Sequence, residues 1–192
     1  KPSRLIRLKE HPSSEKRIFI PDKNYLIQTD NLLINQYKFR TDKEGFIKPS
    51  YIYEKSFADI LFLGGSTTEC RYVDELKRFP YLTGRILEKN EKMKGKKFNT
   101  INSGVSGNNS MHSINLLLNK SLRRKPKIAV LMHNINDLSS LLYMKSYWGE
   151  NKYRSLLVDD KSKELNLLAI PLKIGQAFPQ ISSRINSILP LK

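Results

Sequence analysis

The sequence predicts an α/β domain built on a parallel sheet, because three strand-like segments alternate with two helical patterns. These segments lie at residues 58–63, 98–102 and 127–132. Strands that alternate with helices over short connections form parallel sheets with right-handed crossovers. We therefore expect a three-layer α/β/α architecture, and one that is incomplete at its C-terminal side, since three strands make a small sheet.

The first strand and its crossover helix follow one another closely. Residues 58–63 run into Gly64-Gly65, which is typical of a buried parallel strand that ends in a tight turn. Over residues 80–92 apolar side chains recur at near-helical spacing, and Pro80 suits a first helical turn. This second pattern predicts the first crossover helix.

The second strand leads through a Gly/Ser/Asn segment into the clearest helical pattern of the chain, at residues 111–124. Basic residues occupy its predicted last turn, where the helix dipole favours cations, and Pro126 ends the pattern. The third strand follows at once. The apolar positions of this helix are Ile114, Leu117, Leu118 and Leu122.

The chain divides at about residue 57. Residues 1–57 carry scattered prolines and frequent charge reversals, which predict an irregular or extended arm with a turn at 41–45. Residues 58–192 form the predicted α/β domain. Past Leu138 the pattern weakens and places no further core strand. An aromatic patch between Tyr143 and Tyr153 fits surface packing or, alternatively, stacking against sugar rings.

Length and composition exclude several classes of protein. A chain of 192 residues, 39% hydrophobic and 27% charged, can bury one core and is not of the disordered or low-complexity kind. We find no apolar run of the roughly 18 residues that a membrane span needs, and no signal peptide. Because the sequence starts without Met, we expect upstream residues, which could include an anchor. The single cysteine, Cys70, excludes a Cys-based zinc site, and we expect no metal or cofactor.

The chain is strongly basic. Lys and Arg outnumber Asp and Glu by 34 − 18 = 16, which favours an anionic partner such as a membrane surface, an acidic glycan or nucleic acid. The basic residues are dispersed and not interleaved with aromatic ones, and no helix-turn-helix or finger pattern occurs. We therefore do not expect nucleic-acid binding. It stays an alternative that would require the charges to gather on one face.

Small and polar residues follow all three predicted strands, at the edge where open parallel sheets bind ligands. The turn Gly64-Gly65-Ser66 would present the Ser66 hydroxyl beside backbone N–H groups able to hold an oxyanion. Ser66 is therefore a candidate nucleophile. The alternative is that Ser66 or Thr67 caps a helix and that Glu69 completes a capping box.

Three blocks in this order resemble the SGNH/GDSL hydrolase family, over residues 60–138. They are Gly64-Gly65-Ser66, the pattern Asn-x-Gly-x-x-Gly-Asn at 102–108, and Asn136-Asp137. A further segment at 40–46, Arg-x-Asp-x-x-Gly-Phe, is similar to one in a branch of envelope-polysaccharide proteins. Gly65 and Asn134, where most members of the family carry Asp and Gly, also resemble that branch.

The resemblance implies a serine ester hydrolase or O-acyltransferase that works through an acyl-enzyme. Ser66 would be the nucleophile, and the Gly107 backbone N–H and the Asn136 side-chain amide would donate to the oxyanion beside the Ser66 N–H. Asp137 would hold its loop. The branch implies a small acylated carbohydrate substrate, foremost an O-acetyl ester of an envelope glycan, and a location in the bacterial cell envelope.

The family's Asp-x-x-His block, which supplies the general base, has no match here. The histidines are His11, His112 and His133. We expect the block to lie beyond Lys192. One alternative is that His112 or His133 substitutes. The other is that the protein is an inactive SGNH-like module that binds a glycan or membrane surface, since without a base Ser66 stays a weakly reactive alcohol.

Overall fold

The structure of the chain is a computed structural model, and it describes residues 8–27, 29, 32–148 and 156. The elements named below belong to one compact unit, Lys1–Val158.

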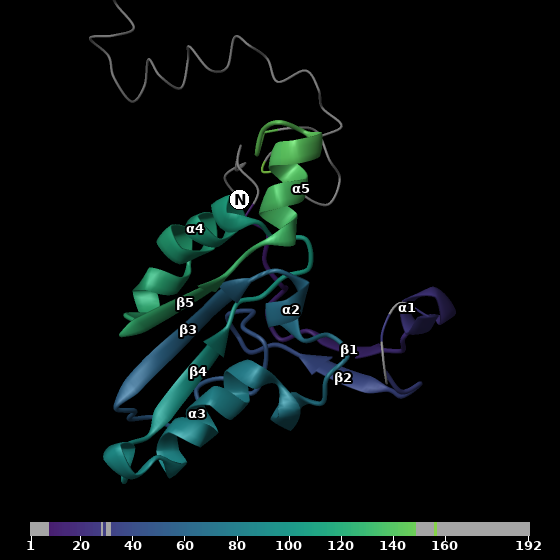
Figure 1. The fold of residues 1–192 in the computed structure, drawn as a ribbon. Helices are drawn as coiled ribbons and strands as arrows, with labels where there is room; N and C mark the ends of the chain where they lie inside the picture. Colours follow the sequence, from purple (N-terminus) through teal and green to yellow (C-terminus); the bar gives the residue numbers. More distant parts are fainter. Residues whose placement is uncertain (1–7, 28, 30–31, 149–155, 157–192) are drawn as a thin grey trace, which may run out of the picture. The chain divides into compact units, whose positions relative to one another are not determined.

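A parallel sheet of three strands forms the centre of this unit (Figure 1). Its strands are β3 (Ala58–Gly64), β4 (Phe98–Asn102) and β5 (Ile128–Met132), in the order β4-β3-β5. All three lie where the sequence predicts strands, and helices flank the sheet, so the predicted α/β class is confirmed. Within the described residues no further strand joins this sheet.

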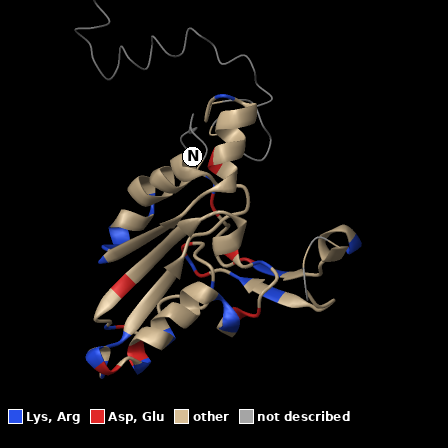
Figure 2. Ribbon diagram, in the orientation of Figure 1, with Lys and Arg blue, Asp and Glu red and all other residues tan. Residues whose placement is uncertain are grey.

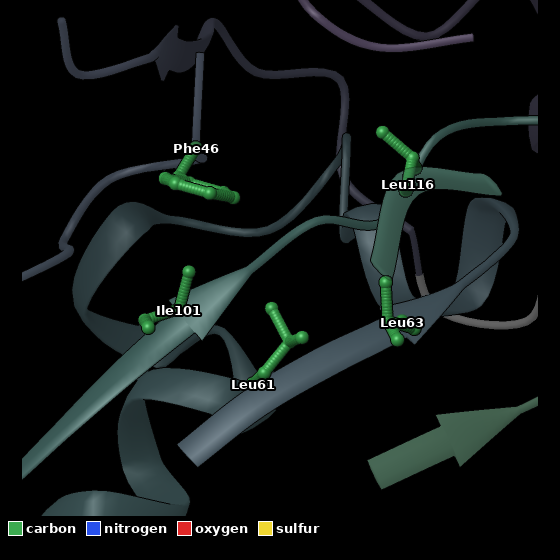
Figure 3. Packing of buried hydrophobic residues seen from close by; sticks show 5 residues of the cluster. All are labelled: Phe46, Leu61, Leu63, Ile101 and Leu116. Carbon is green, nitrogen blue, oxygen red and sulfur yellow. The ribbon is translucent and has the colours of Figure 1, made fainter. Parts of the chain in front are cut away.

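The central strand β3 is covered on both faces, which explains its unbroken apolar run. Its Ile60 and Phe62 face the helix α3 (Phe79–Lys89), whose Phe79 and Leu87 pack against them. The alternate residues of β3 face the opposite side, towards the helix α4 (Ser110–Asn119) (Figure 3). The buried cluster on that side consists of Phe46, Leu61, Leu63, Ile101 and Leu116.

Pro80 lies in the first turn of α3, as predicted, but the helix ends at Lys89, before the predicted boundary, and a 3-10 helix (Glu91–Met93) follows. Gly84 lets α3 approach β4 closely, because a Cβ at this position would lie 3.0 Å from Cγ2 of Thr100.

The second predicted helix also ends early. α4 stops at Asn119, and a separate 3-10 helix (Ser121–Arg124) follows Lys120, whose backbone leaves the helical conformation. The nearly buried Lys120 ammonium lies 3.0 Å from Glu10 and over the ring of Phe46, 4.6 Å from its centroid. The prediction of one helix to residue 124 was wrong, because these long-range contacts of Lys120 leave no trace in the local periodicity.

The segment before β3 contains more structure than an irregular arm. Its elements are β1 (Lys16–Phe19), α1 (Lys23–Ile27) and β2 (Tyr37–Arg40), and the two strands pair antiparallel. Phe39 and Phe46 are fully buried, and Ile47 forms a bridge with Asn102 at the end of β4. Residues 37–47 therefore contribute to the core beside β4.

The predicted turn at 41–45 is present and explains two residues of the Arg-x-Asp-x-x-Gly-Phe segment. Oδ1 of Asp42 accepts the backbone N–H groups of Glu44 (2.8 Å) and Phe46 (3.0 Å). Gly45 takes a φ of +80°, a left-handed conformation that favours glycine. The segment thus builds the turn that places Phe46 in the core.

Charged and aromatic side chains are spread over the surface. Lys and Arg residues lie on several separate elements (Figure 2). Tyr143 and Trp148, at the end of α5 (Ile135–Tyr143) and beyond it, are exposed, and Tyr153 lies outside the described residues. None of the described helices is long and apolar enough to cross a membrane.

Candidate active site

The carboxyl ends of β3, β4 and β5 meet at one edge of the sheet, because all three strands are parallel. The helix α2 (Ser66–Glu69) follows β3, residues 103–109 follow β4, and residues 133–136 follow β5. A pocket of about 270 Å³ lies between the first and the third of these segments, and both Ser66 and Asn136 line it. The other lining residues are Gly65, Thr67, Leu131, Met132, His133, Asn134 and Ile135.

Ser66 is exposed and is the first helical residue of α2. The residue that caps this helix is Gly65, and no side chain forms a capping hydrogen bond there. The capping-box interpretation of Ser66 and Glu69 is therefore wrong. Ser66 lines the pocket, and within the described part of the chain its hydroxyl makes no hydrogen bond to a base.

Gly65 allows the segment after β5 to approach α2. A Cβ at this position would lie 2.5 Å from Nδ2 of Asn136 and 3.2 Å from the carbonyl oxygen of Asn108. The side-chain amide of Asn136 therefore occupies the space that any larger residue at position 65 would need.

The two predicted oxyanion donors are placed differently. Nδ2 of Asn136 donates one hydrogen bond to the Asn108 carbonyl (2.8 Å), which leaves its second N–H for a ligand. Gly107 has a φ of +77° and lies in the loop after β4, and its N–H finds no acceptor among the described residues. Asn136 lines the pocket together with Ser66, whereas Gly107 is not among the lining residues.

The chain at the end of β4 and in the loop after it is fastened to the end of β3 and to α2. The N–H of Val105 donates to the Gly64 carbonyl (3.1 Å), and the side chain of Asn102 donates to the Thr68 carbonyl (2.8 Å). Gly104 lies so close to α2 that a Cβ there would collide with the backbone of Glu69. The loop of Gly107 is thereby tied to the helix that carries Ser66.

Glu69 is buried at the end of α2 and strengthens this connection. One carboxylate oxygen lies 3.2 Å from Nε2 of His11 and 3.3 Å from Nη2 of Arg71, and the other accepts the Ser106 hydroxyl. Burial alone would raise the pKa of Glu69, but the hydrogen bonds from His11 and Ser106 and the charge of Arg71 bring it below its ordinary value. Glu69 is therefore a carboxylate at neutral pH.

Lys9 and His11 also contact the loop after β4, although they lie in the segment predicted as an arm. Nζ of Lys9 donates to the Ser106 carbonyl (2.6 Å). Nε2 of His11 lies 3.1 Å from the Gly104 carbonyl and also faces Glu69, and because both are acceptors Nε2 carries the proton. These pairs are 97 and 93 positions apart in the sequence, so no motif spacing connects them.

His133 lines the pocket, but its ring nitrogens face other residues than Ser66. Nε2 lies 2.7 Å from the hydroxyl of Ser113, and Nδ1 lies 3.6 Å from the Asp137 carboxylate. Burial lowers the pKa of His133, and the negative charge of Asp137 offsets this only in part, so the ring is neutral at pH 7. In this geometry His133 does not act as a base towards Ser66.

Asp137 and His112 hold the elements around the pocket. Asp137 accepts the backbone N–H of Ser110 (2.9 Å) and the hydroxyl of Tyr147 (2.8 Å), so it holds the start of α4. His112 is fully buried and forms a capping box with Asn109. The ring of His112 therefore supports the start of α4.

The pocket suits a small neutral group. Leu131, Met132 and Ile135 give it an apolar wall, and no Lys, Arg, Asp or Glu lines it. The exposed hydroxyl of Ser66 and the side-chain amide of Asn136 share this space. In the described part of the chain no three His, Cys, Asp or Glu side chains group together to hold a metal ion.

Comparisons of the chain with protein-family models, with curated proteins and with solved structures found no match.

Proposed function

We propose that the protein is a serine ester hydrolase or O-acyltransferase of the SGNH/GDSL type. The observation that carries this proposal is the pocket shared by the exposed hydroxyl of Ser66 and the side-chain amide of Asn136. These two residues follow two different strands, 136 − 66 = 70 positions apart in the sequence. The strand order β4-β3-β5 and the helices on both faces of the sheet support the same type.

In the proposed reaction, Oγ of Ser66 attacks the ester carbonyl, and its proton passes to a general base. The charge that develops on the carbonyl oxygen is met by the N–H groups of Ser66 and Gly107 and by the Asn136 amide. The alcohol leaves with a proton, and water or a second alcohol then takes the acyl group from Ser66. The Asp-x-x-His block that would supply this base in the resembling family has no match in residues 1–192.

We propose a small acyl ester on a carbohydrate, foremost an O-acetyl ester of an envelope glycan, as the substrate. The apolar wall and the lack of charged lining residues suit an acetyl group. The net charge of +16 suits an acidic glycan or an anionic surface in the cell envelope. The inactive glycan- or membrane-binding module is the second candidate, favoured by the unpartnered Ser66 hydroxyl.

The test is turnover of p-nitrophenyl acetate by the natural protein, combined with mass spectrometry of the acylated peptide. We expect Ser66→Ala to abolish both turnover and acylation. Ser13→Ala, which removes another exposed hydroxyl, should behave like the wild type. Turnover that survives Ser66→Ala, or the absence of both turnover and acylated Ser66, overturns the enzymatic proposal and favours the binding module.

A further inference from the structure

We infer that Lys9 orients the peptide bond between Ser106 and Gly107 and so directs the Gly107 N–H towards the oxyanion. The role in catalysis rests on the proposed function. The Lys9 ammonium donates to the Ser106 carbonyl at 2.6 Å. This carbonyl and the Gly107 N–H belong to the same planar peptide unit, so a contact with one sets the direction of the other. Lys9 is therefore a positioning residue that never touches the substrate.

The direction follows from peptide geometry. The Ser106–Gly107 peptide is trans, and in a trans peptide the C=O and N–H bonds point to opposite sides. Lys9 holds the carbonyl on the side of the N-terminal segment. The Gly107 N–H therefore points away from that segment, and none of the described residues accepts a hydrogen bond from it.

This peptide needs an anchor because glycine follows it. Gly107 has no Cβ and sits at a φ of +77°, and glycine passes between such conformations at low steric cost. A rotation of the peptide plane would turn the N–H towards Lys9 and remove the donor. Lys9 opposes that rotation by binding the Ser106 carbonyl, and Glu69 fixes the Ser106 side chain by accepting its hydroxyl.

Lys9 is itself held in place beside the loop. Its side chain is nearly buried, and its own carbonyl lies 3.5 Å from Nδ2 of Asn108. Two positions on, His11 contacts the Gly104 carbonyl at 3.1 Å, so the segment runs along the loop. A charged donor also forms a stronger bond than a neutral one and polarises the peptide, which makes the Gly107 N–H a better donor.

The peptide orientation can be measured without any enzymatic activity. Ser-Gly pairs occur in this sequence at 103–104 and 106–107, and nowhere else. Labelling with carbonyl-¹³C serine and ¹⁵N glycine therefore isolates the amide signals of Gly104 and Gly107 in NMR spectra. We expect Lys9→Met to move or broaden the Gly107 signal much more than that of Gly104, and Lys9→Arg to restore it. An unchanged Gly107 signal in Lys9→Met overturns the inference.

Kinetics test the catalytic consequence. We expect Lys9→Met to lower kcat by about tenfold to a hundredfold with little change in KM, less than the full loss of one oxyanion donor. Lys9→Arg should recover most of the rate, and Lys77→Met, at an exposed lysine, should not change it. If Lys9→Met does not fold, Lys9→Gln replaces it with the same expectation. Wild-type kcat in a folded Lys9→Met or Lys9→Gln overturns the inference.

The two proposals fail in distinguishable ways. If Ser66→Ala abolishes turnover but Lys9→Met does not lower it, the enzyme assignment holds and the role of Lys9 is wrong. If Ser66→Ala leaves turnover unchanged, the proposed function is wrong, and the Gly107 signal still decides whether Lys9 orients the peptide.

Discussion

β4 and β5 both pair with β3 in the parallel sense, yet their surroundings differ. All five residues of β4 are buried, whereas four of the five residues of β5 are exposed and one is half-buried. Ile101 of β4 exposes 1% of its surface and Leu131 of β5 exposes 51%. Two strands of equal length thus contribute very differently to the core, and the exposed one, β5, is the more apolar in sequence.

The difference comes from what covers each strand. α3 packs beside β4, and the N-terminal segment extends over its end through the bridge between Ile47 and Asn102. Tyr53 adds two backbone hydrogen bonds to the side chain of Asn99, each 2.9 Å long. Among the described residues no strand pairs with the outer edge of β5. Apolar composition predicts that a strand forms, while its burial depends on distant segments.

The two segments that follow β4 and β5 at the candidate site differ in the same way as the strands themselves. The loop after β4 is anchored by Lys9, Glu69 and backbone bonds, and it offers a backbone donor at Gly107. The segment after β5 is more open and offers a side-chain donor at Asn136, which Gly65 admits by its lack of a side chain. One donor depends on how a loop is held, and the other depends on which side chain is present.

The largest loss of stability should come from shortening a side chain in the buried strand β4. We expect Ile101→Ala to lower the free energy of unfolding by about 2–5 kcal/mol, because it opens a cavity in the cluster with Leu61 and Leu63. Leu131→Ala in β5 should cost less than about 1 kcal/mol, since half of that side chain is already in water. Urea denaturation measures both, and equal losses would show that β5 is as buried as β4.

The role of the Asn136 amide as a hydrogen-bond donor is tested by removing that side chain. If the proposed function holds, Asn136→Ala should lower kcat by roughly 10²–10³ with a much smaller change in KM, the usual cost of losing one oxyanion donor. Asn119→Ala, at the exposed end of α4, serves as the control and should keep the wild-type rate. A wild-type kcat in Asn136→Ala would remove this residue from the oxyanion site.

The anchoring of the loop after β4 should depend on pH. The pKa of Glu69 lies below its ordinary value of 4.5 in the folded protein, so its contribution to stability is fully present above about pH 4.5 and is lost as the pH falls through the folded pKa. We expect Glu69→Gln to cost about 1–3 kcal/mol at pH 7, and the difference from wild type to shrink in acid.

Urea denaturation between pH 7 and pH 3 measures this difference, and Glu54→Gln, at an exposed carboxylate, is the matched control. A gap between wild type and Glu69→Gln that stays constant down to pH 3 would contradict the ionised state of Glu69.

The smallest effect on stability should come from the open strand. We expect Leu131→Thr to change the free energy of unfolding by less than about 0.5 kcal/mol but to reduce concentration-dependent light scattering, because exposed apolar edge strands promote association. Arg17→Lys, on the exposed face of β1, should leave the scattering unchanged. Equal scattering of Leu131→Thr and wild type would show that β5 does not drive association.

Local sequence determined the strands and the direction of the sheet. Residues 58–63 are apolar without interruption, and Gly64-Gly65 follows, so a buried parallel strand and a tight turn are the consistent result. Parallel pairing then brings the ends of β3 and β5 to one edge. That is why Ser66 and Asn136, chosen from the sequence, do line one pocket. Their chemical roles stay predictions.

Tertiary structure decided the features that depend on contacts between distant segments. Three such features are the end of α4 at Asn119, the burial of Glu69 and the contact of Lys9 with Ser106. Each depends on residues that no periodicity or motif spacing connects. A helix or strand pattern records which face of an element is apolar. It does not predict that Lys9 contacts Ser106, 97 positions away, because that contact depends on how the whole chain packs.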